Sequence, residues 1–123
     1  LSSEMKKDCL LPPEVRATIP KLYQQEGVGD PMVYVKLYNP YGIGTWLLIE
    51  YDGQDIAFCY VDLLESEMGY VSVRELESMP AYINGKWYDE IPGIERDLYF
   101  TPRPLSKALK TLNRQELEAK SNV

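Results

Sequence analysis

Residues 45–72 read TWLLIEYDGQDIAFCYVDLLESEMGYVS and contain three runs rich in β-branched and aromatic residues. Asp52-Gly53 separates the first two runs and a polar break precedes the third, which predicts a β-hairpin followed by a third strand. A two-residue turn at Asp52-Gly53 would place Glu50 opposite Asp55, and facing like charges destabilise a strand pair. We therefore predict a four-residue loop from Asp52 to Asp55.

This loop length predicts which residues of the hairpin share a face, because side chains alternate along a strand. One predicted face holds the pairs Leu47 with Tyr60, Ile49 with Phe58, and Tyr51 with Ile56. The other places Trp46, Leu48 and Glu50 beside Ala57, Cys59 and Val61. Neither face is fully polar, so we expect the hairpin to be covered on both sides.

The composition is typical of one globular domain. The 123 residues suffice for one core but not for two domains. Hydrophobic residues at 45% and aromatic residues at 11% argue against disorder. With no basic-then-apolar leader and no apolar run of about 18 residues, we expect a soluble cytoplasmic protein without a membrane partner.

Charge is unevenly distributed along the chain. Residues 41–100 carry three bases and twelve acids, whereas residues 101–123 carry five bases and two acids. An acidic sheet region repels a phosphate backbone, so we expect no direct nucleic-acid binding. The ordinary role of such a charge excess is solubility.

The chain has no histidine and two cysteines, Cys9 and Cys59, which restricts the chemistry available to it. Ser-His-Asp and Cys-His catalytic sites are excluded, and so is a four-thiolate zinc site. The acids around Asp52 do not follow the calcium-loop pattern. We therefore expect no catalytic residues, no metal and no cofactor. Because Cys9 precedes the first predicted helix and Cys59 lies within a strand, we also predict that they are not bonded to each other.

Capping and spacing signals predict three helices. Pro12-Pro13-Glu14 predicts one near residues 13–24, stopped or kinked before Pro20. The capping box Ser72-Val73-Arg74-Glu75 predicts a second over 72–79. Apolar residues at helical spacing predict a third over 105–116.

Further strands are indicated outside the hairpin. Residues 32–38 alternate between apolar and polar side chains, which predicts a strand. Asn84-Gly85 indicates the turn of a small projecting hairpin within residues 81–93. Residues 97–100 are predicted to form an edge strand, because Pro102 and Pro104 cannot continue a ladder.

These elements predict an α+β fold, a single domain with a mainly antiparallel sheet of four to five strands and two or three helices. The domain is expected to span residues 11–112. A disordered N-terminal segment is expected over residues 1–10 and a frayed C-terminal tail over residues 113–123.

Several short phrases, taken in order, resemble a known family. They are Ile19-Pro20-x-Leu22-Tyr23-x-Gln25-Glu26, Val35-Lys36-x-Tyr38-x-Pro40, Thr45-Trp46 with Glu50-Tyr51-Asp52, Gly69-Tyr70-x-Ser72 with Glu75-Leu76, and Glu95-Arg96-Asp97-Leu98-x-Phe100-x-Pro102-x-Pro104-Leu105. Over about residues 11–105 the chain resembles the bacterial domain of unknown function family 2958. The resemblance implies a small cytoplasmic protein often carried on plasmids and other mobile elements, and it supplies no catalytic residues.

Six aromatic or charged residues are candidates for binding: Trp46, Glu50, Tyr51, Tyr70, Glu95 and Arg96. Glu50 lies inside a strand on a largely apolar face, where a carboxylate needs a cation or several hydrogen-bond donors. Arg96 stands between two acids and is predicted to bond carboxylates such as Glu50. Recognition of an anionic ligand by Arg96 is the alternative.

These observations favour a small non-enzymatic binding or accessory protein of a mobile element that acts through contacts with a protein partner. Two alternatives stay open. The first is an acidic anti-defence or DNA-mimic protein that displaces nucleic acid from a host enzyme. The second is a carboxylate-dependent enzyme, which needs a concave pocket that holds Glu50 with a second ionisable group.

Overall fold

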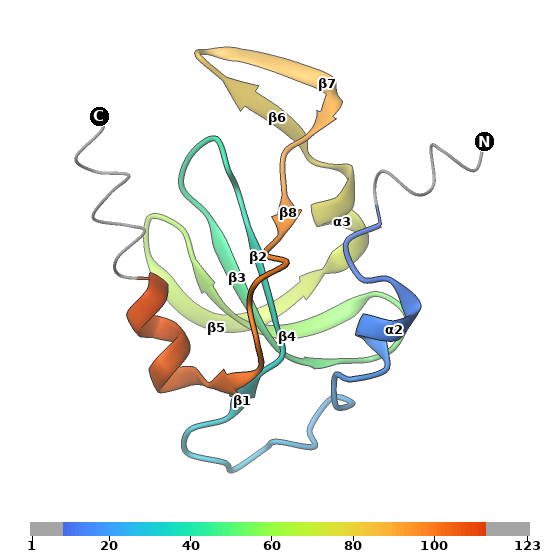
Figure 1. The fold of residues 1–123 in the computed structure, drawn as a ribbon, viewed down its shortest axis with the longest axis vertical. Helices are drawn as coiled ribbons and strands as arrows, with labels where there is room; N and C mark the ends of the chain where they lie inside the picture. The colour runs from blue at the N-terminus through green and yellow to red at the C-terminus, as the bar shows by residue number, and fades with distance from the viewer. Residues whose placement is uncertain (1–8, 113–123) are drawn as a thin grey trace.

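A five-stranded antiparallel sheet forms the centre of the computed structural model, which describes residues 9–112 (Figure 1). Its strands, in spatial order, are β5 (Ser66–Ser72), β4 (Ile56–Asp62), β3 (Thr45–Tyr51), β2 (Val35–Tyr38) and β8 (Glu95–Arg96). The three runs of residues 45–72 are β3, β4 and β5, so the predicted hairpin and third strand are confirmed.

Two small sheets and three helices complete the described fold. β1 (Met32–Val33) pairs with β9 (Arg103–Pro104), and β6 (Pro80–Ile83) pairs with β7 (Lys86–Pro92). The helices are α2 (Pro13–Arg16), α3 (Val73–Ser78) and a helix over residues 105–112. The predicted α+β fold is therefore confirmed. None of the helices in the described part of the chain is long and apolar enough to cross a membrane.

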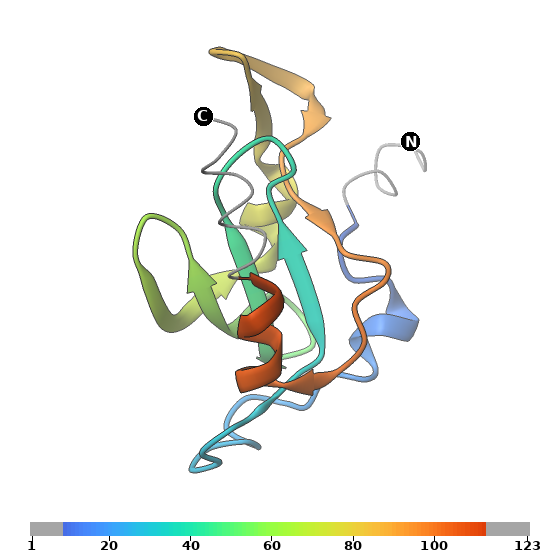
Figure 2. The same ribbon diagram turned by 60° about the vertical axis from the view of Figure 1, so that its left-hand side comes forward.

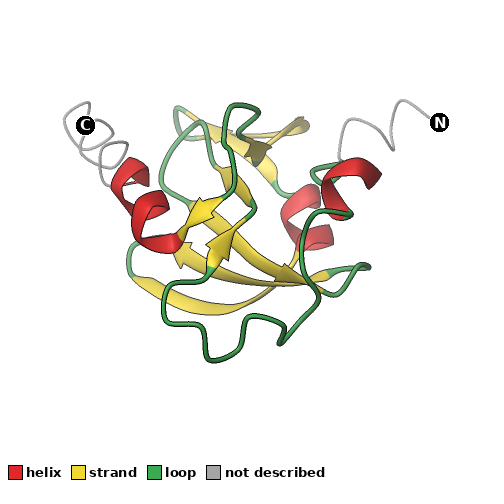
Figure 3. Cartoon of the chain, turned by 60° about the horizontal axis from the view of Figure 1, so that its bottom comes forward, coloured by secondary structure: helices red, strands yellow, loops and turns green. Residues whose placement is uncertain are grey.

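The central sheet is covered on both sides, as predicted. α2 and α3 lie on one side and the helix over residues 105–112 lies on the other (Figures 2 and 3). The first core contains Trp46, Leu48 and Cys59 of the sheet together with Leu76 of α3. The second is formed by Val33, Leu47, Ile49 and Ala108, with partly buried neighbours packed against it.

A bulge in β3 corrects the predicted register of the hairpin. Leu47 faces Tyr60 as predicted, but the register shifts between Leu48 and Glu50. Glu50 then faces Phe58, and Tyr51 faces Ala57. The predicted pairs Ile49 with Phe58 and Tyr51 with Ile56 are therefore wrong. An extra residue in one strand moves the side chains beyond it to the opposite face of the sheet. The Glu50 side chain therefore lies on the Phe58 face instead of the predicted Cys59 face, and Tyr51 lies on the Cys59 face.

The first predicted helix is much shorter than expected. It covers Pro13–Arg16 instead of residues 13–24. Pro20 disfavours helical geometry at Ile19, and the residues after Pro20 form turns instead of a helix. In contrast, α3 is confirmed, with the Ser72 side chain accepting the Glu75 N–H at 3.2 Å. Of the third predicted helix, residues 105–112 are helical and residues 113–116 lie outside the described part. The predicted C-terminal tail also lies outside it, as do residues 1–8.

The predicted projecting hairpin is confirmed, whereas the predicted edge strand is wrong. Asn84 and Gly85 adopt φ values of 52° and 80° at the turn between β6 and β7, which suits this pair. Residues 97–100 form no strand. The edge strand is Glu95–Arg96, and the Asp97 N–H donates to the Lys36 carbonyl at 2.9 Å as the chain turns away.

Both cysteines are free, which confirms the prediction that they are not bonded to each other. Cys9 is exposed, whereas Cys59 is fully buried, and burial raises the pKa of its thiol. A thiol reagent should therefore modify only Cys9 rapidly in the native protein. The unfolded, unreduced chain should show two reactive thiols, and a count of zero would demonstrate a disulfide.

Candidate binding site

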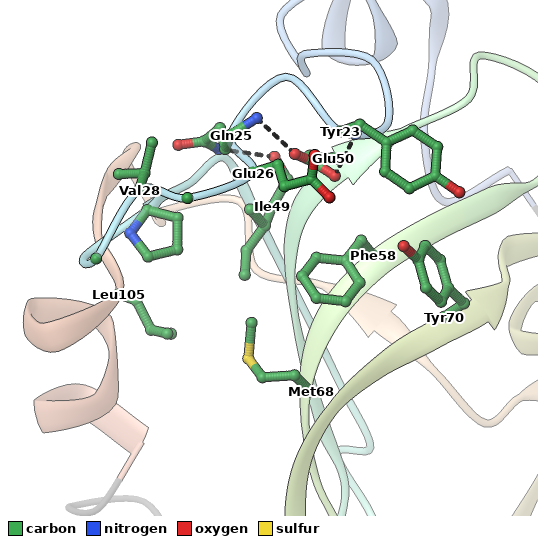
Figure 4. Close-up of a pocket in the computed structure, with 13 residues that line it drawn as sticks. Tyr23, Gln25, Glu26, Val28, Ile49, Glu50, Phe58, Met68, Tyr70 and Leu105 are labelled. Atoms are coloured by element: carbon green, nitrogen blue, oxygen red, sulfur yellow. Dashed lines mark hydrogen bonds between the residues drawn. The ribbon is translucent and has the colours of Figure 1, made fainter.

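A pocket of about 410 Å³ opens between the loop over residues 23–31, called the pocket loop below, and the face of the central sheet formed by β3, β4 and β5 (Figure 4). Leu105 of the C-terminal helix closes one side. The lining residues are Tyr23, Gln25, Glu26, Gly27, Val28, Gly29, Pro31, Ile49, Glu50, Phe58, Met68, Tyr70 and Leu105.

Glu50 fixes the pocket loop to the sheet. Its Oε1 accepts the Tyr23 N–H at 2.8 Å, and its Oε2 accepts the Gln25 N–H at 2.6 Å. The bulge in β3 makes this possible, because it turns Glu50 toward the Phe58 side of the hairpin. The Glu50 side chain is only 4% exposed. Two main-chain donors thus supply the hydrogen bonds that a buried carboxylate requires.

The Gln25 side chain forms a second anchor for the same loop. Its amide nitrogen donates to the carbonyls of Met32 and Ile49 at 2.9 and 3.0 Å, and its amide oxygen accepts the Met32 N–H at 2.8 Å. These bonds join the loop to the start of β1 and to the bulge of β3. Hydrogen bonds therefore hold both ends of the pocket loop against the sheet.

Aromatic side chains form one wall of the pocket. The rings of Phe58 and Tyr70, which are cross-strand partners, lie 4.9 Å apart between centroids. Tyr23 lies beside Tyr70 and adopts a φ of 72°, an uncommon value for a residue other than glycine (Figure 4). The pKa of the Tyr70 phenol is raised by desolvation, then by the adjacent Tyr23 side chain and by the charges of Glu50 and Glu26.

The charge of the pocket has one sign. Among the described residues that line it are the carboxylates of Glu26 and Glu50, and no lysine or arginine. Glu26 is exposed at the lip, whereas Glu50 is buried behind the loop. Within residues 9–112, no group of three or more aspartate, glutamate or cysteine side chains is placed to hold a metal ion. The site can therefore accommodate an apolar group that carries a positive charge.

The structure brings together two of the six candidate binding residues. Glu50 and Tyr70 line the pocket. Trp46 and Tyr51 are 5% and 3% exposed and belong to the first core. Glu95 and Arg96 form β8 at the far edge of the sheet, where the Glu95 carboxylate accepts the Tyr38 hydroxyl at 3.4 Å.

The predicted bond between Arg96 and Glu50 is wrong. Arg96 pairs with Leu37, which pairs in turn with Trp46 at the opposite end of β3 from Glu50. Main-chain N–H groups of the pocket loop take the place of the expected cation. Sequence reasoning identified the need of Glu50 for donors but not their source.

Several pocket residues had no signal in the sequence that set them apart as a group. Gln25, Phe58, Met68 and Leu105 come from the pocket loop, two strands and a helix, and only the folded chain brings them together. The glycines and Pro31 did identify residues 27–31 as a loop. The bulge that turns Glu50 toward them was not foreseen.

Comparison with known protein families gives a match. A family model described as "Protein of unknown function (DUF2958)" matches residues 10–117. The comparison with curated proteins and that with solved structures each found no match.

Proposed function

The chain belongs to the DUF2958 family of proteins of unknown function, and from this premise we propose that it is a non-enzymatic protein that binds a segment of another protein in the pocket. The observation that carries this proposal is that the pocket combines an apolar, aromatic lining with a buried carboxylate. Its walls are mainly apolar and aromatic, and its buried carboxylate is already engaged by main-chain donors. Such lining is typical of binding sites.

The engagement of Glu50 is the reason to favour binding over catalysis. A general acid or base must reach the proton that it transfers. Both Glu50 oxygens instead accept hydrogen bonds from the pocket loop, and the side chain is almost fully buried. Glu50 therefore shapes the pocket and contributes negative charge to it.

The setting that we propose is the cytoplasm of a bacterium, with the gene carried on a mobile element. Support comes from the family resemblance alone. In this setting a small acidic accessory protein would act by binding a protein of the element or of its host.

A pair of methionine substitutions tests binding through the pocket. Met68 lines the pocket and is 42% exposed, and Met79 lies outside it and is 45% exposed. Changes at such exposed positions have small effects on stability, about 0.5 kcal/mol. In affinity purification from the native host, Met68→Arg should lose a protein that the wild type and Met79→Arg both retain.

The same experiment separates the alternatives. A partner retained equally by both variants would contradict binding in the pocket. Recovery of a nucleic-acid enzyme by all three chains, with loss on adding DNA, would instead favour the DNA-mimic alternative.

A further inference from the structure

The outer edge of β5 borders the pocket and has no strand beside it in the described part of the chain. We propose that the partner is an extended basic segment of another protein, which pairs with this edge and places one lysine or arginine side chain in the pocket. This inference rests on the proposed function and specifies the chemistry of its partner.

β5 has the features of an edge that accepts a strand. It is seven residues long, none of its residues is fully buried, and its sequence SEMGYVS contains neither proline nor lysine, the residues that commonly protect sheet edges. A Cβ added at Gly69 would meet no atom within 4 Å, so no described residue covers the sheet face at this position. A strand edge with these features can accept a further strand.

The direction of the main-chain groups links this edge to the pocket. The Val73 N–H donates to the Asp55 carbonyl at 2.8 Å, which continues the ladder between β4 and β5. Successive residues of a strand direct their N–H and C=O groups to opposite sides. The main-chain N–H and C=O groups of Val71 and Gly69 therefore point toward β4. Those of Tyr70 and Met68 point outward, away from the sheet. The side chains of these same two residues line the pocket.

The chemistry of the pocket selects a cation on the incoming segment. The rings of Tyr23, Phe58 and Tyr70 offer electron-rich faces. The carboxylates of Glu26 and Glu50 give the pocket a negative potential, and no base among its described lining residues offsets it. Aromatic faces attract lysine and arginine head groups, and apolar walls accommodate their aliphatic stems. Strand addition supplies main-chain affinity, and a side-chain pocket supplies specificity.

A library of random linear peptides, selected on the full chain, tests this proposal. Recovered peptides should share a lysine or arginine at one position flanked by residues that favour strands. Replacing that residue by norleucine, which keeps the stem and removes the charge, should weaken binding about tenfold. Methylation of main-chain nitrogens should abolish binding at alternate positions only, because a paired segment directs every second N–H toward β5.

Two protein variants complete the experiment. Glu26→Gln should weaken the binding of the lysine- or arginine-containing peptides several-fold and leave the binding of their norleucine forms unchanged. Met68→Arg should abolish the binding of all of them. Recovery of no peptide, absence of a shared cation, or equal sensitivity to methylation at every position would overturn the inference.

The results also distinguish this inference from the proposed function. Suppose that the recovered peptides lose binding to Met68→Arg but need neither a cation nor a free main-chain N–H. The pocket would then still be a protein-binding site, and only the extended basic partner would be rejected. Peptides that bind wild type and Met68→Arg equally would reject both.

Discussion

Glu50→Gln is expected to lower the free energy of unfolding by about 2–3 kcal/mol, the range for a lost hydrogen bond to a buried charged group. The carboxylate accepts the N–H groups of Tyr23 and Gln25, one on each oxygen. A glutamine amide has one oxygen, so its NH₂ group would face one of these donors and leave it unsatisfied. Chemical denaturation of the two proteins measures the difference.

Glu26→Gln is the matched control for this substitution. It makes the same chemical change at a pocket residue that is exposed, so its effect should stay within about 0.5 kcal/mol. Equal and small effects at both positions would show that Glu50 does not hold the pocket loop. Arg96→Ala combined with Glu50→Gln should give additive losses, because Arg96 lies two strands away from β3 and level with Trp46, at the opposite end of β3 from Glu50.

Gly93→Ala is expected to destabilise the protein by about 3 kcal/mol, at the upper end for an added buried group. Gly93 donates its N–H to the Met79 carbonyl at 2.8 Å at the base of the β6–β7 hairpin. A Cβ at this position would lie directly on the Pro80 carbonyl oxygen and 3.1 Å from that of Met79. Both obstacles are main chain and cannot rotate away, so the base of the hairpin must shift.

Gly69→Ala provides the comparison, because an added Cβ there meets nothing within 4 Å. Its effect on the unfolding free energy should be within about 0.5 kcal/mol of zero. If Gly93→Ala were as mild as Gly69→Ala in chemical denaturation, the close approach of residues 79–80 to Gly93 would be refuted.

Local signals predicted the sheet well, because strand periodicity and turn chemistry act over a few residues. Asn84-Gly85 identified the projecting hairpin, and the Ser72 capping box identified α3. The register of β3 and β4 beyond Leu48 could not be predicted in the same way. The bulge occurs together with long-range hydrogen bonds from the pocket loop to Glu50, and no local sequence pattern indicates it.

The candidate site was only partly predictable for a related reason. An acid inside an apolar strand marks a position that needs hydrogen-bond donors, and Glu50 does accept two main-chain N–H groups. A charged partner such as Arg96 can be found by scanning the sequence, whereas a main-chain N–H can come from any residue. Trp46 and Tyr51 are predicted binding residues that lie in the core instead, because aromatic side chains suited to binding are equally suited to a core.

Photo-crosslinking in the native host tests most directly whether the pocket binds another protein. A benzophenone amino acid replaces Tyr70, which lines the pocket and is 54% exposed, or Tyr82 on the projecting hairpin, which is 48% exposed. The proposal predicts a discrete adduct from position 70, mapped by mass spectrometry to an extended segment with a lysine or arginine, and none of that mass from position 82. No adduct from position 70, or the same adduct from both, would contradict it.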